Sequence, residues 1–321
     1  MNDTSYLTLS WTKQDPENKL GLFRGGQFTS PSNNLTFILA LLFSGLFFAF
    51  EFFAMKAIAN KWAVMSIFVD PITRTANLPV IIPIVILFFW CLCILFIKGR
   101  KIKFQQRALS LATVPQQVDF VLNEESTATV LQRMNMLVDS PRHFMLLNRV
   151  ERALSNLKNV GGISDVSSIL SSQADNDESF VTSSYLKIQG FVWAIPVLGF
   201  IGTVLGLSQA IGNFAGTLQA DTADISAIKS NLTNVTGGLA TAFETTLIAL
   251  VASLLVQLYL TRMQEKENKF LDDCNDYCHS HVTSKLRVAQ PQDAYAQYYY
   301  AQQQAAQQQA AQQQAAQQQQ Q

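Results

Sequence analysis

Charged residues are scarce in this chain of 321 residues. Asp, Glu, Lys and Arg together make up 14% of the sequence, against about 25% in ordinary soluble proteins. Lys and Arg total 23, as do Asp and Glu, so the net charge is zero. This composition argues against a polybasic nucleic-acid binder and a highly charged disordered chain. Only four cysteines occur, two of them inside an apolar run, which is not the pattern of a disulfide-stabilised scaffold.

Catalytic motifs are also missing from the largest polar region between apolar segments, residues 98–187. It contains no P-loop, no glycine-rich nucleotide fingerprint and no cluster of metal ligands. Its single histidine, His143, has no partner at ligand spacing and is expected on a helix face or at the surface. We therefore expect no enzyme activity and no cofactor.

Four long apolar runs dominate the rest of the sequence: Leu35–Met55, Leu78–Ile97, Ile188–Ala210 and Leu239–Leu260. A helix needs about 20 mostly apolar residues to cross a bilayer. One such run could be a buried core helix, but four in one chain predict an all-α integral membrane protein with four transmembrane helices. No short apolar segment with a cleavage site precedes the first run, which we expect to be retained.

The distribution of positive charge predicts the orientation of these helices. Residues 1–34, 98–187 and 261–321 carry 19 of the Lys and Arg residues, and the rest of the chain carries four. Because Lys and Arg accumulate on the cytoplasmic side of membrane proteins, both termini and residues 98–187 are predicted to be cytoplasmic. The predicted location is therefore a membrane that the chain crosses several times.

The chain divides into six predicted segments. Within the cytoplasmic insert, apolar residues recur at helical spacing, Ser140-Pro141 suits a helix start and Gly161-Gly162 a break, so we expect a loosely packed helical bundle. The Ala/Gln-rich tail is low in complexity and is expected to be disordered or weakly helical. The segments are an N-terminal stretch (1–34), a first transmembrane pair (35–97), the insert (98–187), a second transmembrane pair (188–260), a cytoplasmic helix (261–289) and the tail (290–321).

Three potential metal ligands share one face of the helix expected after the fourth run. Cys274, Cys278 and His281 stand at i, i+4 and i+7. Cysteine and histidine are the usual zinc ligands, so metal binding is one interpretation. The other is a pair of reduced thiols beside solvated histidines.

Small residues distinguish the third and fourth runs from the first two, in which Phe, Leu, Ile and Trp dominate. Stripes of small residues allow helix backbones to approach closely in lipid, so we expect these two helices to pack together. Pro196 leaves the carbonyl of Val192 without its helical donor and can kink the third helix. The small-residue seam, as we name it, consists of Gly199, Thr203, Gly206 and Ala210 on one helix and Ala242, Thr246, Ala249 and Ser253 on the other, with Gly202 and Gly206 also forming a GxxxG pair.

Polar residues in these runs have both structural and functional interpretations. The threonine hydroxyls could simply bond back to their own helix carbonyls. Glu244 is the only charge in the two runs, and a carboxylate inside a span is a functional hypothesis by default; an interfacial glutamate in contact with water is the alternative. It stands about 200° around the helix from Thr246, on the face of Ile248 and Val251. Glu51 lies nearer the end of its run and is expected to be interfacial.

Two stretches, IPVLGFIGTVLGL (195–207) and GLATAFETTLIALVAS (238–253), resemble the MotA/TolQ/ExbB proton-channel family. The resemblance implies that these helices line a homopentamer around a dimer of a one-span partner of the ExbD/TolR/MotB type. Ion flow past an aspartate of that partner would drive rotation in a bacterial cytoplasmic (inner) membrane. The family's pore threonines match Thr203 and Thr246, and the adjacent Thr245 and Glu244 are further candidates for the ion pathway.

Other functions remain open at this point. Two runs before the insert match the four-span layout of MotA, whereas the Gly-Thr-Val and Thr-Thr-Leu motifs are closer to those of ExbB and TolQ. A structural membrane scaffold would use the seam for assembly only, and a self-sufficient cation channel would use Glu244 as a selectivity ring. A neighbouring coding sequence with one span and a membrane aspartate would favour the motor. The residues do not separate proton from sodium, since both use hydroxyl-lined paths.

Overall fold

The computed structural model describes residues 9–20, 26–58, 78–111, 113–115, 120–155, 163–219, 225–286 and 302–303. Within these ranges every element of regular secondary structure is a helix. Two isolated β-bridges pair Leu9 with Val138 and Leu122 with Leu286. Four of the described helices are long and apolar enough to cross a membrane. The prediction of an all-α chain with four candidate spans is therefore confirmed. The break at Gly161-Gly162 and nearly all of the tail lie outside the described residues.

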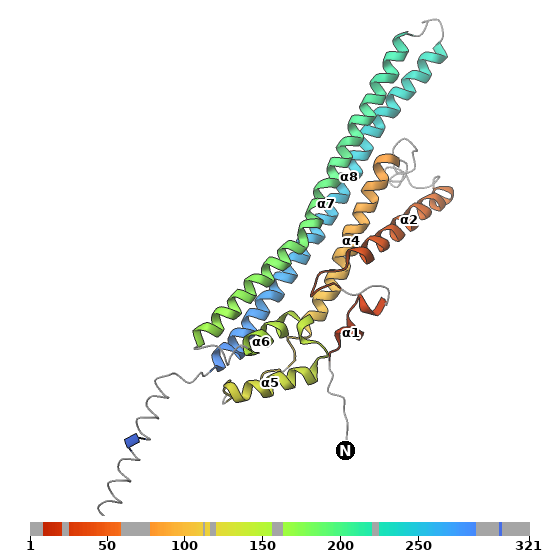
Figure 1. Cartoon of the computed structure of the whole chain (residues 1–321). Helices are drawn as coiled ribbons and strands as arrows, with labels where there is room; N and C mark the ends of the chain where they lie inside the picture. The colour runs from red at the N-terminus through yellow and green to blue at the C-terminus, as the bar shows by residue number, and fades with distance from the viewer. Residues whose placement is uncertain are drawn as a thin grey trace, which may run out of the picture.

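Two antiparallel helices form the spine of the molecule (Figure 1). Helix α7 runs from Ile163 to Gln219 and α8 from Ile225 to His281, each with 57 residues. At 1.5 Å per residue each is about 85 Å long, well beyond the roughly 30 Å of a hydrocarbon core. The third and fourth apolar runs are thus the middle parts of continuous helices, and Pro196 lies inside α7 without ending it.

The other two candidate spans lie on one side of this pair. Helix α4 (Leu78–Gln106) contacts both α7 and α8, while α2 (Asn33–Ile58) contacts mainly α4 (Figure 1). Aromatic side chains fill the α2–α4 contact. Phe47 packs on Phe89 with ring centroids 5.6 Å apart, and the indole of Trp90 donates to the hydroxyl of Thr36 at 3.2 Å.

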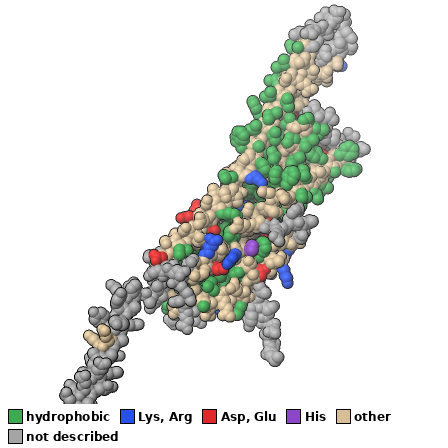
Figure 2. Space-filling model, viewed as in Figure 1, with side chains coloured by type: hydrophobic (Ala, Val, Ile, Leu, Met, Phe, Trp, Pro, Cys, Tyr) green, Lys and Arg blue, Asp and Glu red, His purple; other side chains and the backbone are tan. Residues whose placement is uncertain are grey.

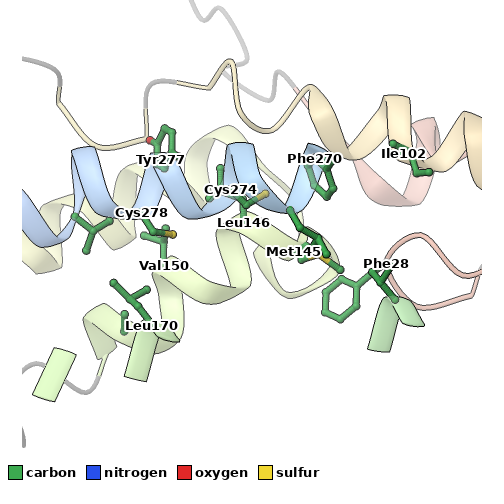
Figure 3. Close-up of a cluster of buried hydrophobic side chains, with 14 of the residues drawn as sticks. Phe28, Ile102, Met145, Leu146, Val150, Leu170, Phe270, Cys274, Tyr277 and Cys278 are labelled. Carbon is green, nitrogen blue, oxygen red and sulfur yellow. The ribbon is translucent and has the colours of Figure 1, made fainter. Parts of the chain in front are cut away.

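The insert folds against the lower ends of the long helices. It contributes α5 (Glu124–Leu137), a 3-10 turn at Pro141–His143 and α6 (Met145–Ser155). Figure 3 shows Leu146 and Val150 of α6 facing Cys274 and Cys278 of α8. The insert is helical, and α4, α7 and α8 extend into this region and supply much of one shared core.

Residues before α2 lie across the same region and form what we call the N-terminal clasp, residues 9–20 and 26–32. It includes α1 (Trp11–Gln14) and a 3-10 turn at Asn18–Leu20. In Figure 2, hydrophobic side chains cover the part of the molecule formed by α2, α4 and the middle of the spine, and charged side chains gather around the insert and the lower ends of α7 and α8. The face seen in Figure 2 is thus divided into an apolar part and a charged part.

Candidate functional site

Glycines bring the backbones of α7 and α8 into direct contact along the small-residue seam. A Cβ added to Gly199 would lie 2.5 Å from the Cβ of Ala249. One added to Gly206 would lie 2.7 Å from both the carbonyl oxygen of Gly238 and the amide nitrogen of Ala242. Real side chains do not tolerate such distances, so only glycine permits this spacing of the helices.

Two threonine hydroxyls meet across this contact. Thr203 Oγ1 and Thr246 Oγ1 are hydrogen-bonded to each other. Thr203 Oγ1 also lies 3.1 Å from the carbonyl oxygen of Ala242 on α8, and Thr246 Oγ1 lies 2.9 Å from that of Gly199 on α7. Each hydroxyl is within 3.3 Å of its own i−4 carbonyl as well. The sequence placed these two residues on facing stripes, and the structure makes them a reciprocal pair.

Thr245 points elsewhere, although it precedes Thr246. Its side chain is fully buried and bonds back to the carbonyl of Thr241 at 3.0 Å. It packs against Gly202 of α7, next to Val80 of α4. Thr203 and Thr246, by contrast, are only partly buried. The structure thus separates Thr245 from the other two hydroxyls, and its place in an ion pathway stays a prediction.

Ser253 satisfies the carbonyl that Pro196 leaves without a helical donor. The hydroxyl of Ser253 donates to the oxygen of Val192 across the helix pair at 2.9 Å. A proline removes the donor for the carbonyl four residues earlier, and a buried carbonyl without a partner is costly. The sequence indicated both the free carbonyl and the small serine, but the bond between them appears only in the structure.

Glu244 lies on a different face of α8 from the threonine pair. Its side chain is half-buried. Ile248 and Val251, expected on its face, line a pocket shared with α2 and α4. The structure therefore directs this face toward the first two spans. The role of Glu244 in ion flow stays a prediction.

Cys274 and Cys278 are buried in the core shared by α6, α7 and α8 (Figure 3). The ring of His281 stacks on Tyr277 with centroids 4.5 Å apart. Among the described residues, no group of three or more His, Cys, Asp and Glu side chains is arranged to hold a metal ion. The geometry is that of two thiols used in packing.

Fully buried charges connect α4 to α8 and the N-terminal clasp. Lys98 Nζ lies 2.9 Å from a carboxylate oxygen of Glu267, and both side chains have no exposed surface. Glu267 also accepts hydrogen bonds from Tyr185 Oη at 2.5 Å and from Thr29 Oγ1. Three helices and the clasp thus meet at a single carboxylate.

A second buried pair lies one turn along α4. Lys101 Nζ lies 2.9 Å from Glu17 and donates to the carbonyls of Gly26 and Ser30. We refer to Lys98, Glu267, Lys101 and Glu17 as the charged junction. From the sequence alone, these lysines served only to predict the orientation of the helices. Their partners lie 84 or more positions away, so no local pattern indicates the ion pairs.

Comparison with known families supports the resemblance first suggested by two short motifs. Residues 142–275 match the family model of the MotA/TolQ/ExbB proton channel family. The matched region covers α6, α7 and nearly all of α8, including the whole seam. The resemblance is confirmed, and the family is one of channel subunits rather than enzymes. Comparison with curated proteins found no match for the chain.

Proposed function

We propose that this chain is an ion-conducting, stator-type subunit of a motor driven by the proton gradient across a bacterial cytoplasmic membrane. The observation that carries this proposal is the Thr203–Thr246 hydroxyl pair, placed between two helices that match a proton-channel family. Residues 98–187 and both termini would lie in the cytoplasm, as the distribution of Lys and Arg indicates.

The chemistry of the pair suits passage rather than retention of an ion. A hydroxyl both donates and accepts hydrogen bonds. Each of the two hydroxyls has three acceptors within reach, its own i−4 carbonyl, the facing carbonyl and the facing hydroxyl, but only one proton to donate. Either can therefore change its donor direction without losing its hydrogen bond. Neutral groups also bind a passing cation weakly enough to release it.

A partner chain would supply the titrating carboxylate. The seam, as defined by its eight residues, contains only glycine, alanine, serine and threonine. Thr203 and Thr246 are partly exposed at the surface of the helix pair, where a one-span partner with a membrane aspartate can approach them. We propose a homopentamer of this chain around a dimer of such a partner, as in the family that it resembles.

Conservative removal of the hydroxyls tests the function. Thr203→Val and Thr246→Val keep the shape of the side chains, and the double variant should lower proton flux more than tenfold, while native mass measurement still finds the intact complex. Thr233→Val is the matched control, because Thr233 is exposed and, among the described residues, its hydroxyl bonds back to its own helix at the carbonyl of Lys229. Flux should be measured in vesicles that hold the chain together with its one-span partner.

A structural scaffold is the second candidate, and one observation favours it. Both hydroxyls already lie close to backbone carbonyls, so they stabilise the α7–α8 contact whether or not ions pass. Under this function the double variant would weaken assembly, and flux measured per intact complex would equal that of the unaltered chain. The two candidates therefore give opposite results in the same experiment.

A further inference from the structure

A pocket lies between α2, α4 and α8, away from the threonine pair. Its volume is about 300 Å³, which is at the lower end of the range for small-molecule sites. Aromatic rings of Phe47, Phe88 and Phe89 form part of the wall, and Ile248 and Leu255 of α8 form another part. The lining comes from three of the four candidate spans, so an occupant would contact all of them.

One carboxyl group is built into this apolar wall. Glu51 of α2 lines the pocket, and only 8% of its surface is exposed. Its Oε2 atom is buried and has no hydrogen-bond partner among the described residues. The sequence suggested an interfacial glutamate, whereas the structure places it against α4 and α8. A buried carboxylate without a partner is costly. A cationic ligand that pairs with Glu51 would remove this cost.

The composition of the wall narrows the chemistry of that ligand. Among the described residues that line the pocket, Glu51 supplies the only side-chain oxygen. Calcium and magnesium ions need about six or more oxygen ligands, and a buried water needs two to four polar partners. An organic ammonium group needs less: one carboxylate accepts its N–H bonds, and aromatic faces attract its charge. A hydrocarbon chain attached to it would fill the remaining apolar volume.

We propose that this pocket binds a protonated organic amine that carries a hydrocarbon chain, with Glu51 as its counter-ion. The ammonium group pairs with the free carboxylate oxygen, and the chain packs on Phe88 and Ile248. Such a ligand comes either from an amine-bearing lipid of the bilayer or from a free amphiphilic amine. Binding joins α2, which otherwise contacts mainly α4, to α8.

Photolabelling of the full-length chain in its assembled state tests the proposal. The probe is dodecylamine with a photoreactive diazirine on its chain, in nanodiscs of phosphatidylglycerol, and the matched probe is dodecanol with the same group. Dodecylamine should label peptides of α2, α4 and α8 around the pocket, and dodecanol should label them at least tenfold less. Adding phosphatidylethanolamine distinguishes the sources: competition identifies an aminolipid, and its absence a free amine, both in support of the amine site.

Two variants decide whether Glu51 is the counter-ion. Glu51→Gln removes the charge at nearly constant size and should lower labelling about tenfold, the order expected for a lost hydrogen bond to a charged group. Glu265→Gln, at an exposed position of α8 outside the pocket, should leave labelling unchanged. If Glu51→Gln fails to assemble, Ala252→Leu fills the pocket and keeps the carboxylate, and it should abolish labelling. Equal labelling by the two probes, or undiminished labelling of an assembled variant, would overturn the proposal.

Discussion

Polar groups are stabilised differently in the small-residue seam and in the charged junction. In the seam they are neutral hydroxyls, and most of their partners are backbone carbonyls a few ångströms away on α7 and α8. In the junction they are full charges with no exposed surface, paired across α4, α8 and the N-terminal clasp. A hydroxyl that loses its partner still has its own helix carbonyl, whereas a buried charge that loses its partner has no equivalent substitute. The junction should therefore tolerate single substitutions far less well than the seam.

Removing one charge from the junction gives the largest expected effect. Glu267→Ala leaves Lys98 buried without its counter-ion, so we expect a loss of about 3–5 kcal/mol in the free energy of unfolding. Glu265→Ala, two positions earlier and exposed, should change it by less than about 0.5 kcal/mol. Denaturant unfolding of the purified protein in detergent measures both. Similar values for the two variants would show that the buried pair does not stabilise the fold.

A substitution in the seam comes next. Gly206→Ala places a methyl group 2.7 Å from backbone atoms of Gly238 and Ala242, so the helices must separate. We expect a loss of about 1–3 kcal/mol in the free energy of unfolding, as for other overpacked sites.

Gly212 offers the control on the same helix. A Cβ there meets nothing within 4 Å, so Gly212→Ala should stabilise the chain by up to about 1 kcal/mol through helix propensity. The opposite signs of the two variants test close packing directly. A stabilising Gly206→Ala would mean that α7 and α8 lie farther apart than described.

The smallest effect concerns the attachment of the clasp to the insert. Burial alone would raise the pKa of Asp139. Hydrogen bonds to its carboxylate outweigh burial and hold that pKa below its ordinary value of 3.8; they come from the amides of Thr12 and Trp11 and from the hydroxyls of Ser10 and Thr12. A lowered pKa means that the carboxylate stabilises the folded state above the ordinary value and that this contribution is lost as the pH falls through the folded-state pKa.

Hydrogen exchange of the clasp therefore checks this attachment. Protection of the Trp11 and Thr12 amides should be retained from pH 6 to 4 and fall below that range, after correction for the intrinsic exchange rate. Asp139→Asn should lower the protection at pH 6 and remove its dependence on the ionisation of this residue. If amide protection in Asp139→Asn equals that of the unaltered chain at every pH, its pH dependence arises from another acid, such as the buried Asp15.

Local patterns carried much of what the sequence could predict. Apolar runs of about 20 residues indicated the four spans, and the spacing i, i+4, i+7, i+11 placed Thr203 and Thr246 each on the small-residue stripe of its own helix, because a helix repeats every 3.6 residues. The same geometry separated Glu244 from Thr246. These features depend only on neighbours along one helix, which is why reasoning from the sequence reached them.

Long-range contacts account for what the sequence did not predict. The pairing of Lys98 with Glu267 and the burial of Glu51 depend on which helices meet. Thr245 adjoins Thr246, yet it packs against Gly202 rather than joining the hydroxyl pair, because successive residues of a helix point about 100° apart. Spacing identifies a face, but it does not show which neighbour covers that face.

The unbroken length of α7 and α8 has a mechanical consequence. Neither helix ends between the charged junction and the hydroxyl pair, so Thr246 and Glu267, 21 positions apart on α8, are joined by a stiff rod of about 32 Å. From Thr246 to the end of α8 at His281 is about 52 Å, so a tilt of about 5° about the threonines displaces that end by about 5 Å. A small reorientation of α8 beside the threonines therefore moves its end at the insert by more than an atomic diameter. Conversely, a displacement of the insert tilts the helix at the threonines.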